Sequence, residues 1–206
     1  ITVDKVKMSK SLGNFFTVRD ILKEYDGEIV RFFMLSAHYR SPINFADTLM
    51  EQAKSAVERV YTCIENLEFL KENAEDTPCT DEFKSKLDGY RKKFCDAMDD
   101  DLNTADAIAA IFDIVYMANT DITSASGKGA IDAVLSLIRE LGAVLGLFTK
   151  EKNNSLDTEV EELIRQRNEA RAAKDWATAD AIRDKLKEMN IVLKDTPDGV
   201  KWSIVE

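Results

Sequence analysis

Apolar residues recur at spacings of three and four along most of the chain, which is the period of a helix with one buried face. The clearest run extends from Phe45 to Leu70 and predicts a long amphipathic helix. Segments with the same period predict further helices at residues 17–26, 28–39, 83–98, 104–117 and 131–147. We therefore predict a mainly α fold, in which these helices form an antiparallel bundle.

Helix breakers and polar stretches separate these segments. Thr17 and Asn103 are residue types that favour helix N-caps, and Arg40-Ser41-Pro42 is expected to end the helix before it. Ser and Gly residues predict a loop at 120–129. Residues 1–16 have no lasting periodicity, so we predict a loop there as well.

The pattern changes after residue 150. A polar linker at 149–155 is followed by two predicted helices and two short predicted strands, at 157–173, 175–189, Ile191–Leu193 and Val200–Val205. Thr196-Pro197-Asp198-Gly199, between the strands, has the chemistry of a tight turn. We expect three parts: the loop and first helix at 1–26, a helical bundle at 27–150, and a small α+β module at 157–206.

Composition limits the class of protein. The 206 residues are 45% hydrophobic, which is enough for one sizeable core or two or three small ones. No apolar run is long enough to cross a membrane, and the first ten residues are polar and basic, unlike a signal peptide. The scattered cysteines Cys63, Cys79 and Cys95 favour free thiols, so we expect a cytoplasmic protein with no membrane partner. Because the chain starts at Ile1 instead of Met, we expect a piece of a longer protein.

The net charge of −10 by itself argues against binding to nucleic acid, but the charge is unevenly distributed along the chain. Residues 1–45 carry a net charge of +2, residues 46–162 carry −13, and residues 163–206 carry +1. A protein that contacts RNA only through its two ends would have this pattern. An ordinary acidic protein would also have it, so charge alone does not choose.

The strongest chemical signal is at the amino end. Two lysines and two hydroxyls lie in the run Lys7-Met8-Ser9-Lys10-Ser11, which continues as Leu12-Gly13-Asn14 and then enters a helix. Lysine is a flexible point charge that can follow a phosphate through its reaction, and donors of this kind stabilise charge on a departing phosphate. We predict a phosphate-binding loop.

This run resembles the lysine-rich signature of class I aminoacyl-tRNA synthetases. The resemblance implies that Lys7, Met8, Ser9, Lys10 and Ser11 bind ATP, with magnesium, and stabilise the transition state of amino-acid adenylation. It makes Lys10 the principal catalytic residue and Lys7 its partner. In the absence of the domain onto which the loop closes, we expect residues 1–16 to be a disordered terminus.

Three later blocks resemble the cysteinyl enzymes of that class in particular. They occur in the family's order at residues 27–41, 94–104 and 167–199, and together they span nearly the whole chain. The departures are small: Lys194 stands where an acidic residue is common, and Asn190 where glycine is common. The resemblance implies a helical bundle of the DALR type, followed by an anticodon-binding module, in a protein that uses ATP, cysteine and tRNA(Cys).

The family's other catalytic parts are not in this sequence. Class I enzymes use a His-x-Gly-His signature, and this chain has a single histidine, His38. The family's zinc is held by cysteine and histidine ligands of the same preceding domain, so we expect no metal site here. For this chain alone we therefore expect no adenylation and no tRNA charging. For His38 itself, capping or packing is favoured over an RNA contact.

The last module carries the predicted tRNA-binding residues. Trp176 lies at the edge of the apolar stripe of the helix 175–189, about 100° from its centre. Aromatic rings stack on unpaired bases, and carboxylates accept hydrogen bonds from base amino groups. We predict a surface composed of Arg167, Arg171, Trp176, Asp180 and Asp195. The alternative for Trp176 is simple packing against Trp202 or the helical hairpin.

Two other functions stay open at this point. A cysteine ligase of mycothiol synthesis resembles the same family and uses the same adenylation, although a small-molecule ligase has no anticodon to bind. A non-enzymatic interaction domain, with the bundle as a protein-binding surface, is the second alternative.

Overall fold

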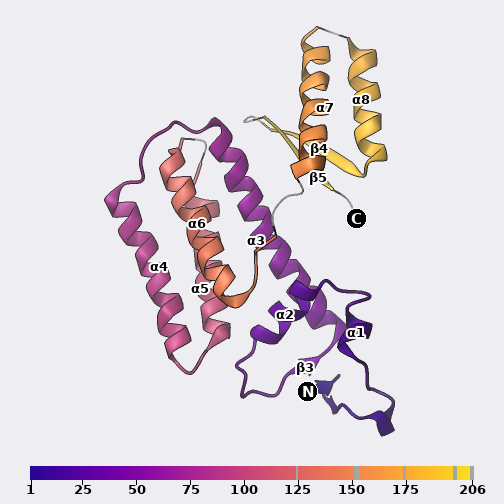
Figure 1. Cartoon of the computed structure of the whole chain (residues 1–206), viewed down its shortest axis with the longest axis vertical. Helices are drawn as coiled ribbons and strands as arrows, with labels where there is room; N and C mark the ends of the chain where they lie inside the picture. Colours follow the sequence, from indigo (N-terminus) through magenta and orange to yellow (C-terminus); the bar gives the residue numbers. More distant parts are fainter. Residues whose placement is uncertain (124, 151–153, 174, 197–198, 205–206) are drawn as a thin grey trace. The chain divides into compact units, whose positions relative to one another are not determined.

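Four long helices lie side by side and form most of the first of two units (Figure 1). The structure is a computed structural model that describes residues 1–123, 125–150, 154–173, 175–196 and 199–204. The chain divides into two compact units, Ile1–Thr149 and Lys150–Glu206, and each is described by itself. The fold is mainly α, as the periodicity predicted. The helices of the first unit are α1 (Val18–Ile21), α2 (Gly27–Leu35), α3 (Asp47–Asn73), α4 (Asp81–Asp99), α5 (Thr104–Asp121) and α6 (Lys128–Leu145).

Side-chain caps explain where several helices begin. Thr17 and Asn103 are N-caps, as the sequence predicted, and accept hydrogen bonds from the amides of Asp20 and Asp106. The single helix predicted at 17–26 is shorter, because α1 ends at Ile21 and the chain turns before Asp26 caps α2. The helix predicted at 28–39 also stops early, at Leu35, and residues 36–43 form an irregular connector to the next strand.

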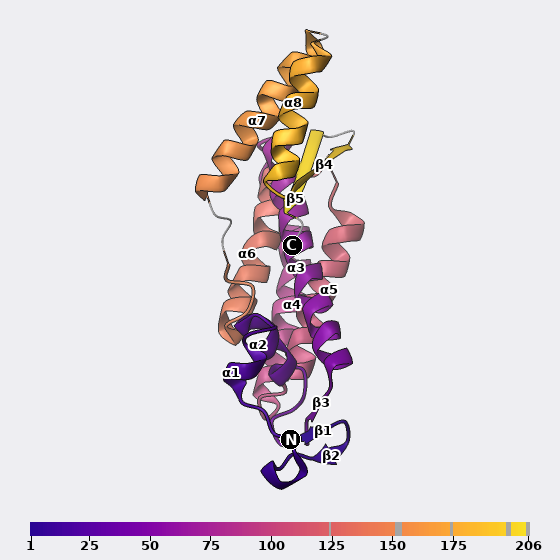
Figure 2. The same cartoon turned by 90° about the vertical axis from the view of Figure 1, so that its right-hand side faces the viewer.

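The amino-terminal segment differs from the predicted loop and disordered terminus. Two-residue strands β1 (Thr2–Val3) and β2 (Val6–Lys7) form a hairpin, and β1 also pairs in parallel with β3 (Asn44–Phe45). The resulting sheet has the order β2-β1-β3 and lies at the amino-terminal end of the unit (Figure 2). Sequence periodicity missed it because strands of two residues are too short to show alternation. The pairing also delays the start of α3 from Phe45 to Asp47.

One continuous apolar core holds the first unit together. α5 and α6 are buried along most of their length, and α3 contributes a complete stripe. The largest fully buried side chains are Met50, Ile111, Ile114, Ile131, Leu137 and Ile138. Burial of a side chain of this size contributes roughly 1.5–3 kcal/mol, so the bundle is a firm support for whatever attaches to it.

Two charged side chains of α2 attach this helix to the end of α6. The carboxylate of Glu28 accepts hydrogen bonds from the Tyr61 hydroxyl, at 2.9 Å, and from the backbone amide of Phe148. Arg31 donates through Nε to the carbonyl of Leu145, one of the last carbonyls of α6. Gly146 ends α6 with φ of 63°, and a Cβ there would lie 2.8 Å from Arg31 Nε. The left-handed φ favours glycine at this position, and a larger residue would also displace the guanidinium from its present place.

The second unit is a helical hairpin with a β-hairpin. Its elements are α7 (Asn154–Ala172), α8 (Trp176–Glu188), β4 (Ile191–Thr196) and β5 (Gly199–Ile204). The antiparallel register pairs Ile191 with Ile204 and Thr196 with Gly199, so both strands are longer or start earlier than predicted. The predicted turn residues Pro197 and Asp198 lie outside the described residues. The small core consists of Val160, Leu163, Leu186 and Ile191, with Ile164, Ile182, Met189, Leu193 and Trp202 packed against it.

We expect Glu28→Ala to lower the free energy of unfolding of the first unit by about 2–3 kcal/mol, because it leaves two donors, one of them on a buried residue, without their acceptor. Glu51→Ala is the matched control, since Glu51 accepts from a tyrosine hydroxyl, that of Tyr25, in an exposed position. Urea unfolding followed by circular dichroism measures both. Equal losses for the two variants would contradict the anchoring role of Glu28.

Candidate functional site

The two lysines of the predicted phosphate loop project from adjoining short elements. Lys7 ends β2, and Lys10 begins the single 3₁₀ turn η1 (Lys10–Leu12). Ser9 caps this turn through its hydroxyl, which accepts from the amide of Leu12, and Gly13 closes it with φ of 68°. That positive φ is the reason for glycine at this position. We call residues 7–14 the lysine loop.

Asn14 holds the two ends of the lysine loop together. Its Oδ1 accepts from the backbone amide of Ser9 at 2.9 Å, and its Nδ2 donates to the carbonyl of Lys7 at 3.2 Å. The Asn14 side chain thus bonds the backbone on both sides of Met8, at the amide of Ser9 and the carbonyl of Lys7. Asn14 belongs to the sequence motif, but the motif alone did not predict this role for it. The residue type could have indicated the role, because Asn side chains commonly form hydrogen bonds with nearby backbone groups in turns.

The lysine loop presents positive charge to solvent. Lys7 and Lys10 are exposed, and among the residues that the structure describes neither has a carboxylate partner. The Lys10 ammonium lies 5.4 Å from the centroid of the Phe15 ring, which is 47% exposed. Two uncompensated ammonium groups beside two hydroxyls can bind an anion with several oxygens, such as a polyphosphate.

A capping box fixes the helix that follows the loop. Thr17 and Asp20 bond reciprocally, with the Thr17 hydroxyl donating to Asp20 Oδ2 at 2.7 Å. This hydrogen bond is the largest of the effects that lower the pKa of Asp20 to about 2, followed by the bond from the Thr17 amide and one from Lys23. The carboxylate therefore stays ionised and keeps α1 attached to the end of the loop.

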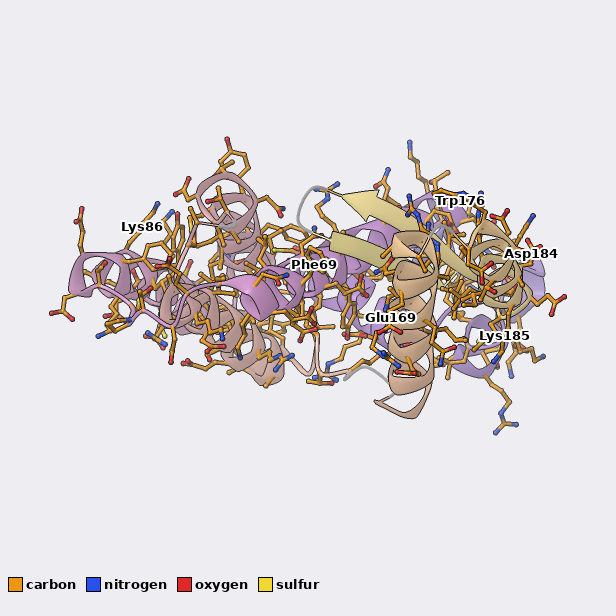
Figure 3. All side chains as sticks on the ribbon, turned by 90° about the horizontal axis from the view of Figure 1, so that it is seen from above. Phe69, Lys86, Glu169, Trp176, Asp184 and Lys185 are labelled. Carbon is orange, nitrogen blue, oxygen red and sulfur yellow. The ribbon has the colours of Figure 1, made fainter. Side chains whose placement is uncertain are left out.

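In the second unit, α8 divides its residues between core and solvent. Ala179 and Leu186 are buried, whereas Trp176 is 60% exposed and Asp180, one turn further on, is exposed as well. Asp175 caps the helix by accepting from the amide and the hydroxyl of Thr178, and these bonds lower its pKa. Trp176 thus projects from the first turn of a capped helix, and Figure 3 shows it on a different side of α8 from Lys185.

The alternative in which Trp176 packs in the hairpin core fits the structure poorly. Trp202 packs against the small core, but Trp176 keeps most of its surface in solvent. Tryptophan is a residue type that is enriched at binding interfaces.

The predicted arginines differ in their surroundings. Arg171 is exposed near the end of α7, whereas Arg167 is only 8% exposed. Arg165, which precedes both of them on α7, forms ion pairs with Glu162 and Glu169. Burial gives Arg167 a part in the packing of the hairpin, which the sequence did not indicate. The backbone of Asp195 pairs with Val200 in the β-hairpin, and its side chain lies outside the described residues.

The predicted residues are divided between the two units. The lysine loop lies in the first, and Trp176, Asp180 and Arg171 lie in the second. Within the described residues, no group of three or more potential metal ligands occurs. No described helix is both long and apolar enough to cross a membrane.

Comparison with known protein families matches three segments in order. Residues 1–55 match the family described as tRNA synthetases class I (C) catalytic domain, residues 93–149 the DALR domain, and residues 153–202 the cysteinyl-tRNA ligase anticodon binding domain. The lysine loop thus falls in the first match, and Trp176 and Asp180 fall in the third.

Two similar proteins extend this result. A protein of Lachnospira eligens named cysteine–tRNA ligase is 52% identical over 206 residues, which cover 98% of this chain and 44% of the relative. The chain therefore spans less than half the length of that relative. Among solved structures, the ternary complex of Agrobacterium radiobacter K84 agnB2 LeuRS with tRNA and LeuAMS matches with a TM-score of 0.55 and 25% identity, covering 72% of this chain and 22% of that one.

The capping box predicts how α1 responds to acid. A folded-state pKa of about 2 lies below the value of about 3.9 for an unfolded aspartate, so Asp20 stabilises the fold above that value and loses the contribution as pH falls through about 2. We expect a carboxyl NMR titration of Asp20 to show the low pKa, and Thr17→Val to raise it toward the ordinary value. An unchanged pKa in the variant would show that the hydroxyl is not its cause.

Proposed function

Because this chain belongs to the cysteinyl-tRNA synthetase family and corresponds to the carboxy-terminal part of its members, we propose that the complete protein activates cysteine with ATP and transfers it to tRNA(Cys). The observation that carries this proposal is the lysine loop. It presents two ammonium groups that have no carboxylate partner within the described part of the chain, on a backbone held by Ser9, Gly13 and Asn14, inside the segment that matches a class I catalytic domain.

The loop acts in the first step of the proposed reaction. The cysteine carboxylate attacks the α-phosphorus of ATP, and the bond to pyrophosphate breaks. Negative charge grows on the departing pyrophosphate, so Lys10 and Lys7 stabilise the transition state more than the bound substrates. Met8, Ser9 and Ser11 would complete the ATP site through backbone groups and hydroxyls, and bound magnesium would supply further positive charge to the phosphates.

Other parts of the reaction require residues beyond these 206. The chain has one histidine, His38, and it contacts Asp101. The paired histidines of the class and the zinc that selects cysteine in this family would therefore come from elsewhere in the protein. We propose that this chain alone neither forms cysteinyl adenylate nor charges tRNA.

The exposed face of α8 serves the second substrate. Trp176 and Arg171 offer flat groups on which unstacked anticodon bases rest, and Asp180 and Asp195 offer acceptors for base amino groups. The support for this assignment is the 60% exposure of Trp176 in a segment that matches an anticodon binding domain. Arg167 would hold a phosphate, and its exposure of 8% leaves little of its surface for that contact.

We expect Lys10→Ala, in the complete protein, to slow adenylate formation on the order of 10²–10³-fold, the cost of losing one good electrostatic donor. The KM for cysteine should change little, because the interaction develops in the transition state. Cysteine-dependent ATP–pyrophosphate exchange measures both quantities. Lys5→Ala is the matched control, since Lys5 is an exposed lysine in the turn of the same hairpin. A rate within about threefold of wild type would refute the role of Lys10.

We expect Trp176→Ala to weaken charging of tRNA(Cys) by about 1–3 kcal/mol, the contribution of one stacked base. Asp180→Ala should chiefly reduce discrimination against single-base anticodon variants. Arg167→Ala should weaken every tRNA alike and flatten the salt dependence, and its burial adds a loss of thermal stability. Charging kinetics with tRNA(Cys) and anticodon variants measure these effects.

Tyr116→Ala is the control for loss of an exposed aromatic ring, since Tyr116 is 73% exposed on α5. If the Trp176 and Asp180 variants stay folded and keep both efficiency and discrimination, the anticodon surface lies elsewhere.

A further inference from the structure

The turn between α4 and α5 has an unusual backbone. Asp101 and Leu102 both adopt positive φ, at 52° and 54°, although neither is glycine. Two consecutive non-glycine residues in this region persist only where surrounding contacts hold them, and such strain is often found at functional sites. The amides of Leu102 and Asn103 donate to the carbonyls of Met98 and Ala97 within the turn itself. The connector at residues 36–43, which leads from α2 to β3, adds side-chain contacts to Asp101.

Asp101 binds three consecutive residues of this connector. The Tyr39 hydroxyl donates to its Oδ1 at 2.9 Å, and the Arg40 guanidinium pairs with its Oδ2 at 3.0 Å. His38 contributes through Nε2, which lies 3.2 Å from the Asp101 carbonyl. A second tie lies beside these, where the Thr104 hydroxyl donates to the carbonyl of Leu35. The residue before the connector and the middle of the connector are thus attached to the α4–α5 turn and the first residue of α5.

An RNA-binding role suits this cluster less well. Tyr39 is 59% exposed, but the His38 ring is stacked on it at 4.8 Å and the Arg40 guanidinium lies 5.3 Å from its centroid. Flat groups of the protein therefore already occupy the ring that a base would need. The neighbouring carboxylates Asp99 and Asp100 would also repel a phosphate.

The connector leads directly into the strand that supports the lysine loop. The amide of Thr2 donates to the carbonyl of Ile43 at 2.9 Å, and that of Asp4 donates to Phe45. The Asn44 side chain adds two bonds, accepting from the Thr2 hydroxyl at 2.9 Å and from the amide of Lys5 at 2.7 Å. Every one of these bonds joins the β1–β2 hairpin to residues 43–45, and the lysine loop begins with the last residue of that hairpin.

We propose that Asp101 is a positioning residue for the lysine loop: by holding Tyr39 and Arg40 it fixes the connector, and through the pairing of β3 with β1 it fixes the hairpin that ends at Lys7 and leads into the turn that begins at Lys10. The inference that Asp101 affects catalysis rests on the proposed function, whereas the inference that it holds the β1–β2 hairpin does not. Asp101 touches no substrate and acts entirely through the connector.

Asp101→Gly is the sharpest variant, because glycine removes the carboxylate while it adopts the positive φ without strain. Asp101→Asn is the conservative partner, since asparagine tolerates this conformation and keeps an acceptor for Tyr39, but loses the charge that pairs with Arg40. Asp113→Ala is the matched control, because Asp113 forms an exposed ion pair with Lys93 on the same two helices.

The first measurement is amide hydrogen exchange by NMR in this chain. We expect Asp101→Gly to speed exchange of the Asp4 and Lys5 amides about tenfold, with a smaller effect of Asp101→Asn, because the connector is released while the bundle is not. Amides in the middle of α5 and α6 should keep their wild-type rates in all variants. Unchanged exchange at Asp4 and Lys5, or faster exchange throughout the bundle, would overturn the proposal.

The second measurement is pyrophosphate exchange by the complete protein. We expect Asp101→Gly to lower kcat about tenfold with the KM for cysteine unchanged, since a displaced lysine loop costs transition-state contacts. Faster amide exchange with an unchanged kcat would overturn the positioning role. If the wild-type protein forms no adenylate at all, the proposed function fails, and the amide-exchange measurement still decides whether Asp101 holds the hairpin.

Discussion

The lysine loop has no apolar core of its own, and its conformation depends on the pairing of β1 with β3. Strands of two residues are unstable alone in water. They persist here because β3 is held between the connector at residues 36–43 and the start of α3, both of which are attached to the bundle. Asn44 strengthens the pairing by satisfying two donors of the hairpin. A support formed by residues 43–45 therefore determines where residues 7–14 lie.

The bundle makes this support rigid through ordinary hydrophobic packing. Its core is continuous from α2 to α6. Glu28 and Arg31 join α2 to the end of α6, and Asp101 joins the connector to the α4–α5 turn. Apolar burial thus supplies most of the stability, and a small number of directional bonds determine the placement of the segments that carry chemistry.

In the second unit, the few large side chains are divided between the small apolar core and the proposed binding surface. A module of about 50 residues buries a limited apolar area, so each core residue matters. Leu186 and Ile191 are used in this core, whereas Trp176 is left in solvent at the first turn of α8. Arg167 is the opposite case: its side chain was expected to contact RNA, but it is largely buried in this unit. The exposed indole is therefore the feature of this unit that packing does not explain.

The sequence by itself predicted most of the helices, two of their N-caps and the presence of the lysine-rich run, because these depend on residues close together in the chain. Thr17, Asn103 and the three-and-four spacing act locally, and so does the Lys-Met-Ser-Lys-Ser run. Only the tertiary structure decided the β1–β3 pairing, the burial of Arg167 and the contacts of Asp101. Each of these joins residues that local patterns do not relate: Thr2 meets Ile43, and Tyr39 meets Asp101 across 62 positions. Such contacts form only once the core has brought their helices together, so no short-range period in the sequence records them.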